Sequence, residues 1–254
     1  MEISVMIVCW NNLNDLKLLI KSLKSEIIHL EKAGIKSNVS IYDNASTDGT
    51  KEFFEKEAPE DWLIHYSKIN YGIGVSRNYL IDQSITGQSK YFFMFDGDVA
   101  ILPESMLEMI RFMEENPELG GLAQHITNST KDPNDPRISI PFPKLQKSDL
   151  IFNIKSGIGA VRGYTHYVVY NRWVFDKNAR FEVGDAFGHA GYGFEDDDIG
   201  MQIHVNLKAD IAAFDICCYH TINSSVPALR KENGLFFEER RRYFLKKWQG
   251  KLFI

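Results

Sequence analysis

Cysteine is scarce in this chain of 254 residues, and its three cysteines have no metal-binding spacing. Cys9, Cys217 and Cys218 fall inside apolar segments that we expect to be strands, and their odd number favours buried, reduced thiols. This usage argues against a disulfide-stabilised secreted domain and against a zinc module. It is typical of a protein that works in the cytoplasm.

Long apolar runs are also missing, since none approaches the roughly 18 residues needed to span a bilayer. The N-terminus leads straight into an expected strand without a basic, cleavable signal. A net charge of −5 and a pI near 5.8 argue against a wholesale electrostatic binder of nucleic acid and leave a local basic patch as the alternative. There is no internal repeat and no low-complexity segment. With 44% hydrophobic residues the chain can bury a full core, so we expect a protein that folds unaided and is soluble or at most attached to a membrane surface.

Short apolar runs alternate with helical patterns over about the first hundred residues. The expected strands are Ile3–Trp10, Val39–Tyr42, Leu63–Tyr66 and Tyr91–Phe95, and the expected helices are Leu16–Leu30, Lys51–Lys56 and Ser76–Ser84. This alternation predicts a Rossmann-like, mostly parallel central sheet flanked by helices. Ligands of such sheets bind beyond the carboxyl ends of the strands.

The second half is less regular. We expect a helix over Glu104–Glu115 and strands over Gly121–His125, Gly163–Tyr170 and Asp210–Tyr219. Four prolines and little periodicity predict a long loop over Asn128–Lys147.

The segment Tyr91–Leu102 opens with an apolar run that is typical of a central strand of a parallel sheet, covered on both faces. The run ends in two carboxylates, Asp96 and Asp98. In an extended chain these side chains point the same way, and Gly97 has no side chain to block a ligand between them. Two like charges at a strand end repel each other unless a cation joins them, and Mg²⁺ or Mn²⁺ prefers such oxygen ligands. The alternative is an ordinary turn that closes the strand.

Four acidic residues in a row, Glu195 to Asp198, follow a glycine-rich and aromatic stretch. A solvated helix N-terminus explains such a run, because acids there face the positive end of the helix dipole. An acid at a helix entrance beside a metal site is also well placed to act as a base. His220, at the end of the last expected strand, is either structural or a metal ligand.

The tail Phe236–Ile254 mixes basic and aromatic residues and predicts an amphipathic helix. It suits peripheral contact with an anionic membrane surface, but docking of its aromatic face on the sheet is favoured.

Taken in order, these segments resemble the family 2 glycosyltransferases, which have the GT-A fold. The resemblance covers about residues 3–250 and rests on the segments SVMIVCWNN, IYDNASTDGT, NYGIGVSRN, FDGDV (a DXD motif), GYGFEDDDI and YH, with an FLKKW-like ending. It implies one GT-A domain with a nucleotide-sugar-binding half over residues 1–102, an acceptor-side half with a smaller sheet over 103–235, and the C-terminal basic aromatic helix over 236–254.

The resemblance also implies a donor site. The residues that it places around the nucleoside and the diphosphate are Val8, Cys9, Trp10, Asn11, Asp43, Gly72, Arg77, Asp96 and Gly97. Asp43 is implied to hydrogen-bond the base, and Asp96 to contact the ribose or the metal. The implied ligands of Mn²⁺ or Mg²⁺ are Asp96, Asp98 and His220.

By the same resemblance Asp196 is the general base, with Glu195 beside it. A metal would neutralise the leaving diphosphate of a nucleotide-diphosphate sugar, most simply a UDP-sugar. The carboxylate would deprotonate the acceptor hydroxyl from the opposite face, which inverts the anomeric centre. The acidic run leaves Asp197 as an alternative base. The acceptor is not indicated and includes saccharides, lipid-linked saccharides, protein side chains and modified nucleic-acid bases.

The chain departs from the family pattern at two places. The family usually carries proline, threonine and tyrosine where Val8, Cys9 and Trp10 stand, and often a basic residue at the position of Gln202.

Three other functions share some of these features. A haloacid-dehalogenase-like phosphatase would use Asp96 as a nucleophile, but its nucleophile strand usually opens the domain. A nucleotidyltransferase needs a glycine-rich, basic phosphate loop near the first strand, which this sequence lacks. A non-catalytic nucleotide-sugar-binding module would have kept the fold without the chemistry.

Overall fold

The computed structural model describes residues 1–124, 144, 150–153, 166–183, 194–214, 219–220 and 239–251. Its strands are β1 (Glu2–Cys9), β2 (Lys36–Asp43), β3 (Leu63–Tyr66), β4 (Tyr91–Asp96), β5 (Val99–Ala100), β6 (Gly121–Gln124), β7 (Leu150–Asn153), β8 (Tyr167–Asn171), β9 (Ile211–Phe214) and β10 (Tyr219–His220). The helices are α1 (Leu13–Lys32), α2 (Thr50–Glu57), α3 (Ile73–Ser84), α4 (Ser105–Glu115), α5 (Arg172–Asp176) and α6 (Glu195–Met201), with a π-helix η3 (Gln202–Asn206) continuing α6.

Eight strands form one sheet in the order β3-β2-β1-β4-β8-β6-β9-β7, and β10 pairs with β5 in a second, two-stranded sheet. The pairs β3-β2, β2-β1, β1-β4 and β6-β9 are parallel, whereas β8 runs antiparallel to both β4 and β6. The expected α/β architecture with a mostly parallel sheet is therefore confirmed. β4 lies near the middle of the sheet, as its apolar sequence predicted.

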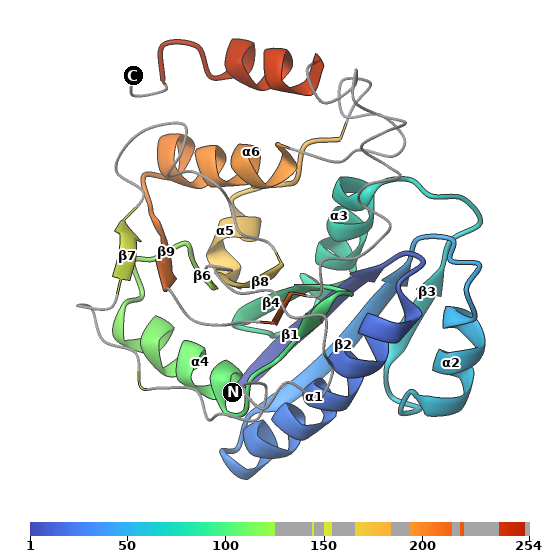
Figure 1. Cartoon of the computed structure of the whole chain (residues 1–254). Helices are drawn as coiled ribbons and strands as arrows, with labels where there is room; N and C mark the ends of the chain where they lie inside the picture. Colours follow the sequence, from blue (N-terminus) through green and yellow to red (C-terminus); the bar gives the residue numbers. More distant parts are fainter. Residues whose placement is uncertain are drawn as a thin grey trace.

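Both faces of the sheet are covered because alternate side chains enter different cores. Along β1, Ile3, Val5 and Ile7 join the core that holds α1 and α4, while Met6 and Val8 join the core that holds α3, α5 and α6. Figure 1 shows these two sets of helices on opposite sides of the sheet. Each fully buried side chain of this size contributes about 1.5–3 kcal/mol to folding, so the two cores fix the strand ends rigidly.

The elements expected in the first hundred residues are confirmed, with ends that differ by up to three residues. One expectation is wrong. The run Asp210–Tyr219 does not form a single strand, because Ile211–Phe214 pairs with β6 and β7 in the large sheet while Tyr219–His220 pairs with β5 in the small one. The strand expected over Gly163–Tyr170 begins at Tyr167 within the described residues, and nearly all of the expected loop Asn128–Lys147 lies outside them.

The C-terminal segment is helical over residues 239–247. Its buried aromatic residues, Phe244 and Trp248, belong to the core that also holds α6, and the Phe244 ring stacks on Phe194 at 5.5 Å between centroids. The aromatic face is therefore docked, as the sequence favoured, but it docks through α6 and not directly on the sheet. In Figure 1 this helix, coloured red, lies beyond α6 on the side away from the sheet.

Glu26 of α1 fixes the start of α4 across 78 residues of sequence. Its carboxylate, 1% exposed, accepts the backbone N–H of Glu104 at 2.6 Å and that of Met106 at 3.1 Å. These N–H groups belong to the first turn of a helix, where no intrahelical acceptor is available. Because Glu104 has a left-handed φ of 65°, the cap also holds a strained turn just after β5.

We expect Glu26→Ala to lower the free energy of unfolding by about 2 kcal/mol, since the buried N–H of Met106 and the partly buried N–H of Glu104 lose their shared acceptor. Glu31→Ala, at an exposed position of the same helix, is the matched control and should change stability by less than about 0.5 kcal/mol. Urea unfolding of the two variants measures the difference. Equal losses for both would show that the cap does not stabilise the protein.

Candidate active site

The carboxyl ends of β1, β2 and β4 meet at one edge of the sheet. Registers place Cys9 opposite Asp43 on β2 and Val8 opposite Asp96 on β4. Val8 and Cys9 are buried, and the Cys9 thiol donates to the Tyr42 carbonyl oxygen at 3.8 Å. The edge expected to bind a ligand therefore brings together residues from three separate segments.

The loops after β1 and β2 are joined by side-chain hydrogen bonds. Asn11, which follows the half-buried Trp10, accepts the Thr47 backbone N–H at 2.8 Å through its side-chain oxygen, and its own N–H donates to the Ser46 hydroxyl at 3.0 Å. The Asp43 carboxylate accepts the Ser46 N–H at 3.0 Å. Burial raises the pKa of Asp43, and its hydrogen bonds to Ser46 counteract only part of this shift.

Left-handed backbone accompanies these loops. Asn11 has φ of 48° and Ala45 has φ of 68°. Strain of this kind persists where the surrounding structure fixes it, and it gathers at binding sites. The next loop is built in the same way, because Gly72 has φ of 85° and its N–H donates to the Asn70 side chain at 2.8 Å.

Asp48, in the loop after β2, caps the start of α1. Its carboxylate accepts the Leu13 N–H at 2.8 Å and the Thr50 hydroxyl at 2.6 Å. The Asn12 side chain makes no capping bond and lies against Gly97 instead.

Asp96 is the last residue of β4, and Gly97 and Asp98 form the two-residue turn between β4 and β5. Gly97 is required here because a Cβ at that position would lie 2.5 Å from the Asn12 side-chain nitrogen and 3.0 Å from Cys9 Cβ. The glycine therefore makes room for its protein neighbours, whereas the sequence had suggested that it made room for a ligand.

Arg77 of α3 connects the strand end to the acidic helix. Its guanidinium, 1% exposed, donates to Asp96 Oδ1 at 2.7 Å through Nη2 and to Asp196 Oδ1 at 2.6 Å through Nη1. Glu195 Oε1 lies 3.9 Å from Nη1. Burial lowers the pKa of Arg77, but the Asp196, Asp96 and Glu195 carboxylates more than offset this and raise it. One buried cation is thus shared by the DXD segment and the acidic run.

Asp196 stands at the start of α6, where Phe194 adopts a left-handed φ of 66° in the N-cap position. Glu195 is 5% exposed, and the Asp196 side chain is 23% exposed. The expected helix start at the acidic run is confirmed. This helix carries Asp196 to the same guanidinium that holds Asp96.

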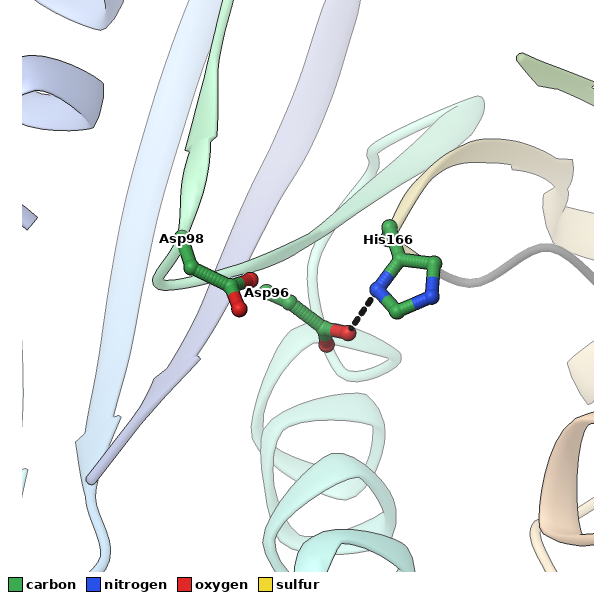
Figure 2. A group of neighbouring side chains, drawn as sticks. All are labelled: Asp96, Asp98 and His166. Atoms are coloured by element: carbon green, nitrogen blue, oxygen red, sulfur yellow. Dashed lines mark ion pairs between the residues drawn. The ribbon is translucent and has the colours of Figure 1, made fainter. Parts of the chain in front are cut away.

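His166 was not anticipated from the sequence. It precedes β8, and because β8 runs antiparallel to β4, its Nδ1 lies 2.7 Å from Asp96 Oδ2 (Figure 2). Its carbonyl oxygen also accepts the Asp96 N–H at 3.1 Å. The sequence places a histidine directly before an apolar run, but it does not show that this run pairs with β4. Without that pairing, His166 could not be assigned to the site. Burial lowers the pKa of His166, but Asp96, Asp98 and Asp196 raise it to about 9.

Tyr170, also on β8 and also missed, is fully buried near this group. Burial raises the pKa of its phenol, and Asp196 raises it further. Burial likewise raises the pKa of the Asp96 carboxyl, but Arg77 and His166 lower it more strongly, so that its pKa falls below the usual range.

Asp96, Asp98 and His166 form a group that could hold a metal ion, since one ligand atom from each lies within 4.8 Å of the others. Figure 2 shows the three side chains pointing toward one another. Two ligands of an ion such as Mg²⁺ lie at most about 4.2 Å apart, so small side-chain shifts would close the group around it. Two carboxylates and an imidazole suit Mn²⁺. The residues present therefore fit a divalent ion.

His220, expected as a metal ligand, is described only through its backbone. It pairs with Val99, the residue after Asp98, so the chain brings position 220 beside the DXD turn. None of the helices in the described part of the chain is long and apolar enough to cross a membrane.

Comparisons with known proteins give one family match and several structures with the same fold. The sequence model for glycosyl transferase family 2 matches residues 4–173. No curated protein matches the sequence significantly. The structure is similar to residues 1–349 of TarS from S. aureus, with a TM-score of 0.61 and 17% identity over 94% of this chain and 65% of that one. This chain thus spans less than two thirds of that structure.

Two further structures have the same fold. TarS 1–349 in complex with UDP has a TM-score of 0.62 and 16% identity over 97% of this chain and 72% of that one. The mannosyltransferase PcManGT from Pyrobaculum calidifontis, in complex with GDP-Man and Mn²⁺, has a TM-score of 0.57 and 13% identity over 94% and 64%. At these identities the likeness establishes the GT-A fold.

We expect the His166 imidazole of the metal-free protein to titrate near pH 9, because the Asp96 carboxylate stabilises its charged form. A raised pKa means that the pair stabilises the folded protein below about pH 6.5, and that this contribution is lost as the pH rises through about 9. NMR titration of the seven histidines, with His166→Gln to assign the signal, measures the midpoint. Asp96→Asn should move it below 7. A midpoint near 6.5 in the unsubstituted protein would contradict the ion pair.

Proposed function

We propose that this chain, which belongs to glycosyl transferase family 2, transfers a sugar from a nucleotide-diphosphate donor to an acceptor hydroxyl with inversion at the anomeric carbon. The observation that carries the proposal is the pairing of Arg77 with both Asp96 and Asp196. Through these two ion pairs, Arg77 links Asp96, at the candidate diphosphate and metal site, to Asp196, the candidate base. An inverting transfer needs these two groups close together on opposite sides of the sugar.

The donor nucleoside is assigned to the edge formed by β1 and β2. Val8, Cys9, Trp10 and Asn11 would line its pocket, and Asp43 would accept a hydrogen bond from the base. In support, Asp43 is 2% exposed and lies directly opposite Cys9. A buried carboxylate with one N–H donor retains acceptor capacity for a ligand.

The diphosphate is assigned to the DXD turn and the start of α3. A divalent ion, Mn²⁺ or Mg²⁺, would be held by Asp96, Asp98 and His166, with His220 as a further candidate. When bound, it would neutralise charge on the departing diphosphate. Gly72 is the N-cap of α3 and Arg77 lies within the helix. The first N–H groups of a helix can bind an anion. Gly97 keeps the turn close to Asn12 and so fixes where both carboxylates stand.

Asp196 is proposed as the general base, with Glu195 beside it. Its side chain is partly accessible, whereas Glu195 is almost fully buried, so Asp196 is the one that can reach a hydroxyl. Arg77 keeps Asp196 ionised and oriented before the acceptor arrives. As the proton moves to Asp196, the same guanidinium remains paired with Asp96, so the buried cation is never left without a counter-charge.

UDP is the proposed nucleotide, because TarS, with the higher TM-scores, has been crystallised with UDP. PcManGT has been crystallised with GDP-Man, so GDP is the alternative. The acceptor is proposed only as a hydroxyl, on a saccharide, a lipid-linked saccharide, a protein or a modified nucleic-acid base. Gln202 stands where many relatives have a basic residue; here it holds Asp198 and the Arg180 backbone.

We assign successive segments of the chain to the donor and to the acceptor. Residues 1–102 are assigned to the donor, 103–235 to the acceptor and 236–254 to a helix that supports the acceptor side. The family match disfavours the phosphatase and nucleotidyltransferase alternatives. For the phosphatase, Asp96 would have to be a free nucleophile, yet both its oxygens are held by cationic groups.

The proposal is tested by incubating the protein with UDP-, GDP-, dTDP- and CDP-sugars in Mn²⁺ and with simple saccharide acceptors. We expect release of one nucleoside diphosphate and a product whose anomeric configuration, read by NMR coupling constants, is opposite to that of the donor. Retention of configuration would contradict the mechanism. Phosphate covalently bound to Asp96 would instead support the phosphatase.

We expect Asp196→Asn to reduce the transfer rate by about 10²–10⁴-fold, because the amide cannot take a proton. Binding of the nucleoside diphosphate should stay within twofold. Asp197→Asn is the matched control at the neighbouring position and should retain most of the activity. Steady-state release of the nucleotide measures both variants. If Asp197→Asn were the inactive one, the base assignment would move by one residue.

A further inference from the structure

We infer that the C-terminal segment at residues 239–251, helical over 239–247, positions the base for transfer, with Trp248 and Lys247 acting through Asp198. The inference rests on the proposed function, in which Asp196 is the base. It assigns to the tail a task within the active site, which the tail performs through α6.

The two aspartates lie on opposite faces of α6. Successive residues of a helix are rotated by about 100°, so Asp196 and Asp198 point about 200° apart. Asp196 accepts from Arg77 on the side of the strand ends. Asp198, 0% exposed, faces the C-terminal helix. The helix that carries the base is therefore held from both sides.

Asp198 is held by three side chains. Trp248 Nε1 donates to its Oδ1 at 2.8 Å, and Lys247 Nζ lies 2.9 Å from its carboxylate oxygens. Gln202 Nε2 donates to Oδ2 at 2.7 Å. A buried carboxylate with this many donors has one favoured orientation, and loss of a donor leaves the charge poorly compensated. Because Asp198 is in the first turn of α6, its orientation sets the orientation of that turn.

The tail reaches the turn before α6 as well. The Phe244 ring stacks on Phe194, the left-handed residue that precedes Glu195. Arg240, 2% exposed, lies in the field of Glu195: burial lowers its pKa and the Glu195 carboxylate counteracts this. Lys247 additionally pairs with Glu182, which lies in the segment after α5. Four side chains of the C-terminal segment thus act on three residues at the start of α6, namely Phe194, Glu195 and Asp198.

A purely structural helix would stabilise the fold without affecting the reaction once the protein is folded. A positioning helix has a different consequence. Small shifts of a base away from its acceptor slow transfer by as much as about 10²-fold, while donor binding at β1, β2 and β4 is unaffected. The split between transfer rate and donor affinity therefore separates the two roles.

Trp248→Phe is the sharpest variant, because it removes the indole N–H and keeps an aromatic ring in the core. Lys247→Met removes the second donor and keeps the aliphatic stem. We expect each to lower kcat by about 10- to 100-fold at unchanged nucleoside diphosphate affinity. Lys247→Arg keeps a donor at this position and should therefore retain much of the kcat that Lys247→Met loses. Lys246→Met, at an exposed position of the same helix, is the control and should leave kcat unchanged.

Hydrogen exchange gives a readout that does not depend on activity. Trp248→Phe should speed exchange at least fivefold in peptides covering 195–206 and leave those covering β1 and β2 unchanged. Faster exchange with unchanged kcat, or a uniform loss of protection across the sheet, would overturn the inference. If the parent protein transfers no sugar, the proposed function fails, but the local exchange effect would still establish the control of α6 by the tail.

Discussion

A single buried guanidinium organises the functional edge of this protein. Arg77 is 1% exposed and is paired at 2.7 Å with Asp96 and at 2.6 Å with Asp196. An arginine in the interior without counter-charges would cost several kcal/mol, and two carboxylates gathered at one site without a cation would repel each other. The three groups therefore have to be arranged together, and that requirement fixes α3, the end of β4 and the start of α6 relative to one another.

The arrangement joins segments that are far apart in the sequence. Asp96 and Asp196 are separated by 100 positions, and His166 enters from a third segment because β8 is antiparallel to β4. If β8 ran parallel to β4, its C-terminal end, and not His166 at its N-terminal end, would lie beside Asp96. The antiparallel strand β8 thus supplies a second cationic partner, His166, so that each carboxylate oxygen of Asp96 has one. In the proposed reaction, donor-side and acceptor-side groups share these charges.

Much of this site was predictable from local sequence. The apolar run before Asp96 predicted a central buried strand, and the acidic run predicted the start of α6. The order of the motifs predicted that Asp43, Arg77 and Asp96 belong to one edge. These features depend on periodicity and on strand ends, which local sequence encodes well.

Other features depended on tertiary pairing and could not be predicted. His166 needed the strand order, and the division of Asp210–Tyr219 between two sheets needed the pairing partners of each piece. The cap on α1 comes from Asp48, 35 residues away, so no local capping rule could find it. The docking of Trp248 on Asp198 likewise depends on a contact over 50 residues.

The measurement that tests the central claim most directly is isothermal titration of the purified protein with UDP, GDP, dTDP and CDP, in Mn²⁺ and in excess chelator. The account predicts that one of these nucleotides binds and that its binding requires the metal, since Asp96 and Asp98 would contact the diphosphate through the ion. Binding of none of them in Mn²⁺, or equal binding in chelator, would contradict a metal-dependent donor site at this edge of the sheet.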